Sequence, residues 1–131
     1  MKQSIRAAAR LLYASLSVLL FLCVVLQFYW AGLAVFGNAS HWSTHVQFVH
    51  LFGFNLPVVM LLAAFAAAHR RWAYWHLLLL MLSTFLMYLS ANLPLGSLRA
   101  LHPLVGTLLL AAAISNCYRS IHACRKRTIS A

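Results

Sequence analysis

Four long apolar runs constrain this sequence more than any other feature. They cover about residues 11–36, 46–68, 72–93 and 100–118. Because an α-helix rises about 1.5 Å per residue, roughly 20 apolar residues cross the hydrocarbon core of a bilayer, which is about 30 Å thick. Each run comes close to or exceeds that length. The sequence therefore predicts a single domain of four membrane-spanning helices.

The composition agrees with membrane insertion and excludes several classes of enzyme. Of the 131 residues, 64% are hydrophobic and 8% are charged, whereas about a quarter of the residues in soluble domains are charged. The sequence contains no Asp or Glu. Glycosidases, aspartic proteases and HExxH metalloproteases need carboxylates, and ion-coupled transporters usually use them inside the membrane. These absences disfavour an enzyme. A Ser–His nucleophile pair stays open as an alternative, but no GxSxG-type motif supports it.

The connections between the runs are short, and the basic residues lie in clusters at their ends. Loops such as HRRW, residues 69–72, force neighbouring helices to run antiparallel, which predicts an all-α, up-down-up-down four-helix bundle. Nine of the ten Lys and Arg residues belong to this loop and the two chain ends, and the tenth is Arg99. Basic loops stay in the cytoplasm, so both termini are predicted there. The clusters match the headgroups of the lipid bilayer, and no basic face indicates nucleic-acid binding.

Two histidines lie near the starts of predicted helices that enter the membrane from the same side. His50 belongs to the second apolar run, and His102 lies at the start of the fourth. Two neutral imidazoles that face each other across a four-helix bundle can supply both axial ligands of a b-type haem. The sequence therefore predicts His50 and His102 as the metal ligands of a haem b near the outer face.

Each of these histidines is followed by a glycine on the same helical face. Gly53 lies three residues after His50, and Gly106 lies four residues after His102. A missing side chain would let a flat porphyrin approach the backbone, and Arg99 could pair with a propionate. Gly53, Gly106 and Arg99 are therefore the predicted cofactor-binding residues. The alternative is that the glycines serve close helix packing and that each histidine hydrogen-bonds a loop carbonyl.

The remaining histidines fit the haem hypothesis less well. His45 lies about 140° from His50 around a helix, so both cannot easily face one iron. His41 and His45 are expected in the loop before the second helix, and an outer metal site shared with His50 is their alternative role. His76, one turn into the third predicted helix, is expected to pack against its neighbours.

Two prolines affect the predicted helices. Pro57 is expected to kink the second helix, because proline has no amide hydrogen to donate. Pro103 leaves two starts open for the fourth helix. The helix begins either at Pro103, with His102 as a cap residue, or near Ser97, with Pro103 in about the first turn.

Three sequence elements carry a resemblance to a known family. They are LQFYWAGLAVFG at the end of the first run, HLFG in the second and LHPLVG at the start of the fourth. In this order they resemble a bacterial family of small four-helix membrane proteins of unknown function. The resemblance implies a four-helix architecture and a bacterial inner membrane, but no activity. More distantly, paired histidines on such a bundle are similar to the b-type cytochromes.

These observations favour a haem-binding electron-transfer protein that needs a redox partner or a quinone. The rival hypothesis is a cofactor-free accessory or assembly subunit of a larger respiratory or photosynthetic membrane complex. A small transporter of lipids or metabolites is a third alternative, which the absence of acidic residues disfavours.

Overall fold

The structure is a computed structural model that describes residues 2–94 and 96–128, and within these ranges it is helical and has no strand. The helices are α1 (Lys2–Phe36), α2 (His41–Phe52), α3 (Asn55–Ala66), α4 (Arg71–Asn92), α5 (Gly96–Arg99) and α6 (Leu101–Thr128). Four segments are long and apolar enough to cross a membrane: Lys2–Phe36, His41–Ala66, Arg71–Asn92 and His102–Arg125. The prediction of an all-helical chain with four such segments is confirmed.

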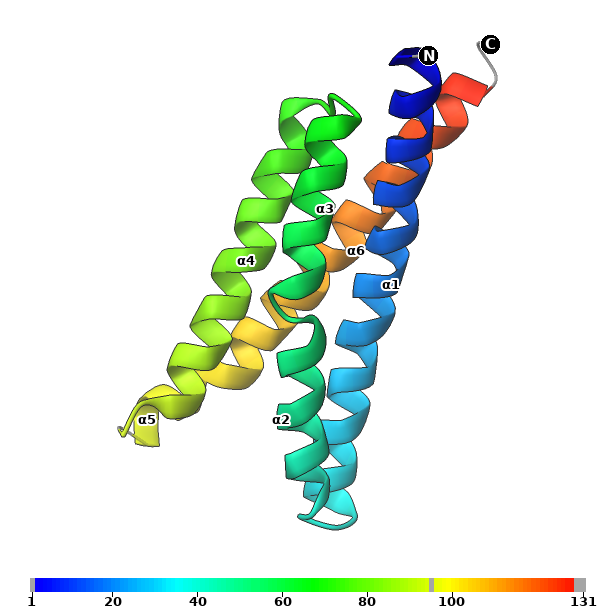
Figure 1. Cartoon of the computed structure of the whole chain (residues 1–131). Helices are drawn as coiled ribbons and strands as arrows, with labels where there is room; N and C mark the ends of the chain where they lie inside the picture. Colours follow the sequence, from blue (N-terminus) through cyan, green and yellow to red (C-terminus); the bar gives the residue numbers. More distant parts are fainter. Residues whose placement is uncertain (1, 95, 129–131) are drawn as a thin grey trace.

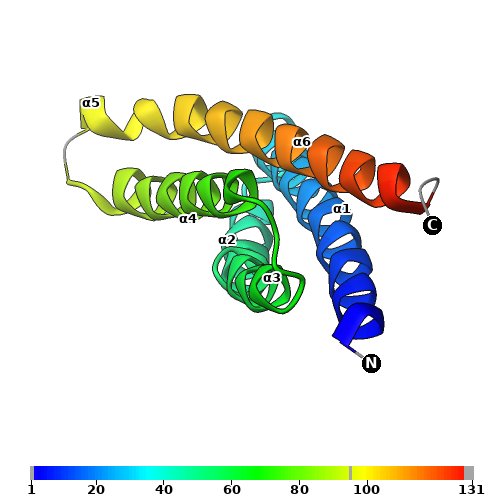
Figure 2. The ribbon, with the colours of Figure 1, turned by 90° about the horizontal axis from the view of Figure 1, so that it is seen from above.

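The four segments run antiparallel in chain order (Figures 1 and 2). Both chain ends and the α3–α4 connection lie at one end of the molecule, which we call the terminal end. The α1–α2 connection and α5 lie at the opposite end, which we call the α5 end. The basic clusters of the sequence therefore gather at the terminal end, and Arg99 belongs to the α5 end.

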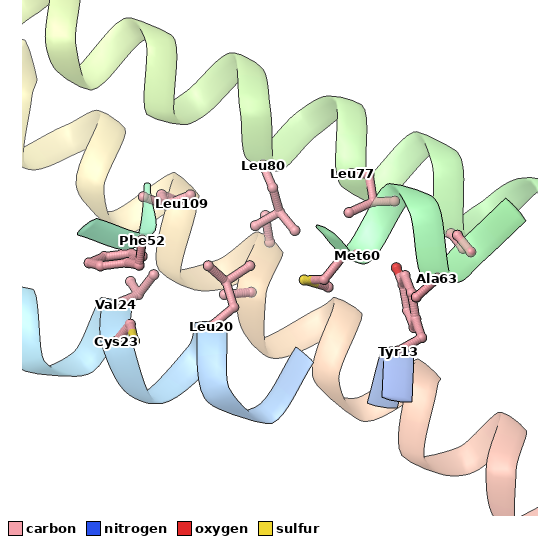
Figure 3. Packing of buried hydrophobic residues seen from close by; sticks show 14 residues of the cluster. Tyr13, Leu20, Cys23, Val24, Phe52, Met60, Ala63, Leu77, Leu80 and Leu109 are labelled. Atoms are coloured by element: carbon pink, nitrogen blue, oxygen red, sulfur yellow. The ribbon is translucent and has the colours of Figure 1, made fainter. Parts of the chain in front are cut away.

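The hydrophobic core forms where the helices cross in the middle of the molecule. Figure 3 shows side chains from α1, α3, α4 and α6 pointing toward one another there, with Met60 and Leu80 wholly buried. Small residues such as Ala64 and Ala113 complete the interior, whereas Leu62 is 64% exposed on the outside. Small residues at helix contacts and large apolar residues outside are typical of helices that pack within lipid.

A buried polar cluster joins α1 to α6 toward the terminal end. The Tyr13 hydroxyl donates to Asn116 Oδ1 at 2.8 Å, and Asn116 Nδ2 donates to Ser17 Oγ at 3.0 Å. The Ser17 hydroxyl donates in turn to the Tyr13 carbonyl at 2.8 Å. All three side chains are at most 1% exposed. The cluster therefore fixes the relative positions of the first and last helices.

The second long apolar segment is broken into α2 and α3 at Gly53–Phe54. Pro57 has no amide hydrogen, so the carbonyl four residues earlier, that of Gly53, loses its helical donor. Asn55 Nδ2 donates to the Leu51 carbonyl at 2.8 Å and so satisfies an acceptor next to the break. The kink predicted from Pro57 is present as this interruption.

The break directs α2 away from α4 and α6. α2 packs against α1 and α3, but among the described residues none of its Cα atoms lies within 8 Å of α4 or α6. Figure 1 shows the resulting divergence at the α5 end. We call this region the wedge: α2 forms one side, α4 and α6 form the other, and side chains span the distance between them.

Candidate functional site

The α1–α2 turn places His45 inside a helix. The Asn38 side chain accepts the Ser40 amide at 2.8 Å, and the Ser43 hydroxyl donates to the Ser40 carbonyl at 2.7 Å. These contacts organise the start of α2, which begins at His41. His41 and His45 therefore belong to α2 rather than to the loop that the sequence analysis expected.

His45 and Gln27 hold α2 against α1 by two reciprocal hydrogen bonds. Gln27 Nε2 donates to the His45 carbonyl at 3.0 Å, and His45 Nδ1 lies 3.2 Å from the Gln27 carbonyl. A carbonyl oxygen can only accept, so His45 Nδ1 carries the proton. The lone pair of the imidazole is therefore on Nε2.

His102 is anchored to α4 in the same manner. Its Nδ1 lies 3.1 Å from the Met87 carbonyl and 3.1 Å from Ser90 Oγ. The Ser90 hydroxyl donates to the Met87 carbonyl at 3.1 Å, which leaves its oxygen free to accept the His102 proton. His102 Nε2 therefore also keeps its lone pair.

The fourth segment starts between the two alternatives left open by the sequence. α6 begins at Leu101, after the short helix α5 (Gly96–Arg99). Pro103 therefore lies in the first turn, where the missing amide hydrogen costs little. His102 is a helical residue of this first turn, and it reaches α4.

The rings of His45 and His102 meet across the wedge. Their centroids are 6.4 Å apart, and their planes are inclined by 61°. Metal–imidazole bonds are about 2 Å long, so two imidazoles on opposite sides of one ion have centroids about 6 Å apart. An Nδ1–H bonded to a backbone carbonyl is also the usual second contact of a metal-ligating histidine. The pair therefore has the spacing and the tautomers of two axial ligands.

His50, the other predicted ligand, contacts a different residue. Its Nδ1 lies 3.1 Å from the Tyr88 hydroxyl, and the two rings are 5.3 Å apart. The His50 side chain is exposed at the surface of the bundle. The structure thus brings His102 together with His45, while His50 pairs with Tyr88.

The two predicted glycines lie at close helix contacts. A Cβ atom on Gly106 would meet Phe28 Cζ at 3.4 Å and Met87 Cε at 3.5 Å. A Cβ atom on Gly53 would lie 3.3 Å from Thr84 Cγ2. Both glycines therefore let α4 approach its neighbours, which is the packing role that the sequence analysis held as the alternative.

The other residues considered in the sequence analysis take local roles. Arg99 Nε donates to the Leu93 carbonyl at 2.9 Å, so Arg99 ties α5 to the end of α4. The His41 ring lies 5.8 Å from the Trp30 ring. His76 hydrogen-bonds the Trp72 carbonyl and Ser115 Oγ. In the described part of the chain, no group of three or more His, Cys, Asp or Glu side chains could hold a metal ion.

His45 is the site residue that sequence reasoning missed. The signal that could have found it is the Gly-Asn pair at 37–38, which marks a tight turn. A turn at that point lets the helix begin at residue 41 instead of 46. The loop is then only residues 37–40, and His45 moves into the helix.

Part of the chain matches a known protein family. Residues 27–92 match the model of a family described as a family of unknown function, DUF6220. The matched segment contains Gln27, His45 and His50 and ends before His102. No curated protein and no solved structure matches the chain.

Proposed function

Because the chain belongs to the DUF6220 family, whose function is unknown, we propose a function from the site itself: a multi-pass membrane protein that binds one b-type haem through His45 and His102. The family membership agrees with the resemblance to an uncharacterised family, and it assigns no activity to any residue. The proposal therefore depends on the chemistry of the described side chains.

Membrane insertion is the first part of the proposal. It is supported by four apolar segments of sufficient length and by an exterior of exposed Leu and Phe side chains. The basic residues at the terminal end support a cytoplasmic position for that end in a bacterium, with the α5 end at the outer face of the inner membrane. Fusions at the C-terminus test this: a fluorescent reporter that folds in the cytoplasm should be active, and alkaline phosphatase, which needs the periplasm, should be inactive.

The haem assignment depends on one observation, the close approach of the His45 and His102 rings, whose centroids are 6.4 Å apart. Both rings direct Nδ1–H to a main-chain carbonyl, those of Gln27 and Met87. Both therefore keep a lone pair on Nε2, which is the atom that binds haem iron in bis-imidazole proteins. The predicted role of His102 is kept, and we assign the second ligand to His45 in place of His50.

The pair has aromatic neighbours on α2, where the Trp42 ring lies against that of His45 with centroids 5.5 Å apart. The backbones of α2 and α6 stay more than 8 Å apart, so the two histidines meet only through their side chains. Aromatic residues line α2, where the rings of Phe48 and Phe52 lie 5.1 Å apart. Arg99 is a basic residue at the α5 end, and we propose that its guanidinium pairs with a haem propionate.

Haem b would supply one-electron exchange at this site when bound. The Gln27 and Met87 carbonyls would hold both imidazoles in the ligating tautomer. Since no carboxylate is available to move protons, we propose that the protein transfers electrons and relies on a separate redox partner or a quinone. A larger membrane complex could provide that partner.

The test is the dithionite-reduced minus oxidised absorption spectrum of the protein purified in detergent. We expect a Soret band and split α and β bands in the wild type. Both His45→Ala and His102→Ala should lose the split α and β bands of the low-spin haem. His41→Ala and His50→Ala are matched controls on the same helix, and both should retain the spectrum.

Two results would contradict the proposal. A colourless wild-type protein without iron, especially one that purifies with a stoichiometric membrane partner, would favour the cofactor-free accessory subunit instead. A spectrum that survives His45→Ala and is lost in His50→Ala would return the second ligand to the residue predicted from sequence.

A further inference from the structure

A second polar pair lies close to the histidine site but faces outward. His50 Nδ1 lies 3.1 Å from the Tyr88 hydroxyl, which joins α2 to α4 at the surface of the bundle. His50 is nine residues beyond His41, about 13 Å along the helix axis. It therefore lies well inside the candidate membrane segment His41–Ala66.

An exposed polar pair at this depth is unusual for a membrane helix. Ionisable side chains in membrane segments normally face the interior of the bundle or pair with one another, because lipid offers them no hydrogen bonds. His50 and Tyr88 satisfy one atom each by their mutual contact. The contact uses only one of the two ring nitrogens of His50, so Nε2 remains for a further hydrogen bond. The Tyr88 hydroxyl can likewise both donate and accept, and the contact with His50 uses only one of these roles.

The donor and acceptor roles of His50 Nε2 and of the Tyr88 hydroxyl depend on the tautomer of His50. If the Tyr88 hydroxyl donates to Nδ1, then Nε2 carries a proton and can donate to a carbonyl. If Nδ1 carries the proton and donates to the Tyr88 oxygen, then Nε2 accepts from a hydroxyl and the Tyr88 hydroxyl can donate elsewhere. One pair of side chains can thus bind either a quinone carbonyl or a quinol hydroxyl.

We propose that the His50–Tyr88 pair is a lipid-facing binding site for the headgroup of a quinone or quinol. The Phe54 ring stacks on Tyr88 with centroids 5.7 Å apart and planes inclined by 13°, which provides a flat apolar wall. Leu51, 68% exposed, and Phe85, 54% exposed, extend the apolar surface along α2 and α4. An isoprenoid tail can lie on such a surface and continue into the lipid.

The position of the pair links it to the proposed haem site, and in this respect the inference rests on the proposed function. Tyr88 directly follows Met87, whose carbonyl accepts the His102 proton. His50 lies five residues after His45, about 7.5 Å along α2. A headgroup bound here would therefore be a close neighbour of the haem ligands.

The experiment uses the full chain in lipid nanodiscs and a short-tail azidobenzoquinone photolabel. Labelled residues are mapped by mass spectrometry, with and without an excess of decyl-benzoquinone as competitor. We expect saturable labelling of α2 and α4 near His50 and Tyr88. Tyr88→Phe, which keeps the ring on Phe54 and removes only the hydroxyl, and His50→Leu should each reduce labelling about tenfold, as expected for the loss of a hydrogen bond to the headgroup.

The matched controls come from another exposed Tyr–His pair, Tyr118 and His122, whose rings stack with centroids 5.9 Å apart near the terminal end. Tyr118→Phe and His122→Leu should label as the wild type does. Labelling that is not saturable, or that is unchanged in both Tyr88→Phe and His50→Leu, would overturn the inference.

The redox spectrum of the same samples separates this inference from the proposed function. Quinone labelling at His50 and Tyr88 in a protein without haem would support the quinone site and contradict the haem proposal. A protein that contains haem but shows no competed labelling there would overturn the quinone site and leave the haem proposal intact.

Discussion

The imidazole rings of His45 and His102 approach one another across the wedge, with centroids 6.4 Å apart and planes inclined by 61°. Each ring is held by an Nδ1–H bond to a main-chain carbonyl on a different helix, Gln27 on α1 and Met87 on α4. Three helices besides α6, namely α1, α2 and α4, therefore carry or hold the two imidazoles. Each imidazole keeps a lone pair on Nε2. This arrangement is the basis for treating the pair as a ligand set and not as two packing residues.

Ser90 should contribute to haem affinity through His102. Its oxygen lies 3.1 Å from His102 Nδ1, and Ser90→Ala removes one of the two acceptors of that proton. Removing such an outer contact typically weakens metal affinity by roughly 10-fold or more. The rate of haem transfer from the purified protein to apomyoglobin measures the effect. Ser83→Ala is the control, because Ser83 is buried on the same helix and its hydroxyl has no hydrogen-bond partner; an equal effect of both substitutions would contradict the prediction.

Gln27→Leu should change stability little, although the side chain is buried. The substitution loses the hydrogen bond from Nε2 to the His45 carbonyl, worth about 0.6 kcal/mol within a membrane. It also removes Gln27 Oε1, a buried oxygen that has no hydrogen-bond partner. The two effects oppose each other, so the free energy of unfolding in mixed micelles should change by less than about 1 kcal/mol. A loss of about 3 kcal/mol would show that the amide does more than hold α1 against α2.

Tyr13→Phe should destabilise the protein by about 1–3 kcal/mol, because it leaves the buried Asn116 Oδ1 without its donor. Adding Asn116→Leu to Tyr13→Phe should recover part of that loss, since it removes the unsatisfied amide. Tyr74→Phe is the matched control: its hydroxyl makes a longer bond of 3.3 Å to the Ala64 carbonyl in a half-buried position. Unfolding in mixed micelles measures all three, and an equal cost for Tyr13→Phe and Tyr74→Phe would argue against the buried cluster.

Gly106 should tolerate alanine but not leucine. A Cβ atom there makes contacts of 3.4 and 3.5 Å with Phe28 and Met87, which is close to ordinary van der Waals distance, whereas a larger side chain would push α4 and α1 away from α6. Gly106→Leu should therefore lower thermal stability and weaken haem binding, because His102 lies one turn earlier on the same helix. Gly32→Leu, where a Cβ atom meets nothing within 4 Å, should affect neither. Equal stability of the two leucine variants would contradict this packing account.

The architecture could be predicted from sequence because it depends on properties of single segments. Apolar length determines which segments can span a membrane, and short loops determine that neighbours run antiparallel. The break between α2 and α3 could be predicted for the same reason. It depends on a single residue, Pro57, which removes a backbone hydrogen-bond donor from any helix interior.

The proposed ligand pair, His45 and His102, could not be predicted in the same way, because it depends on contacts between segments. His45 belongs to a helix because the chain turns at Asn38, whose side chain accepts the Ser40 amide just before α2 begins. Counting apolar residues does not detect this contact. The orientation of His45 toward His102 then depends on how α2 diverges from α6. Gly53 and Gly106 likewise take their packing role from Thr84, Phe28 and Met87, which come from other helices.

The most direct test of the central claim is the electron paramagnetic resonance spectrum of the oxidised, purified protein. We predict the low-spin ferric signal of bis-imidazole haem in the wild type and in His50→Ala, and its loss or conversion to a high-spin signal in His45→Ala and His102→Ala. A wild-type protein without a low-spin haem signal, or one whose signal persists in His45→Ala, would contradict the assignment of His45 and His102 as the axial ligands.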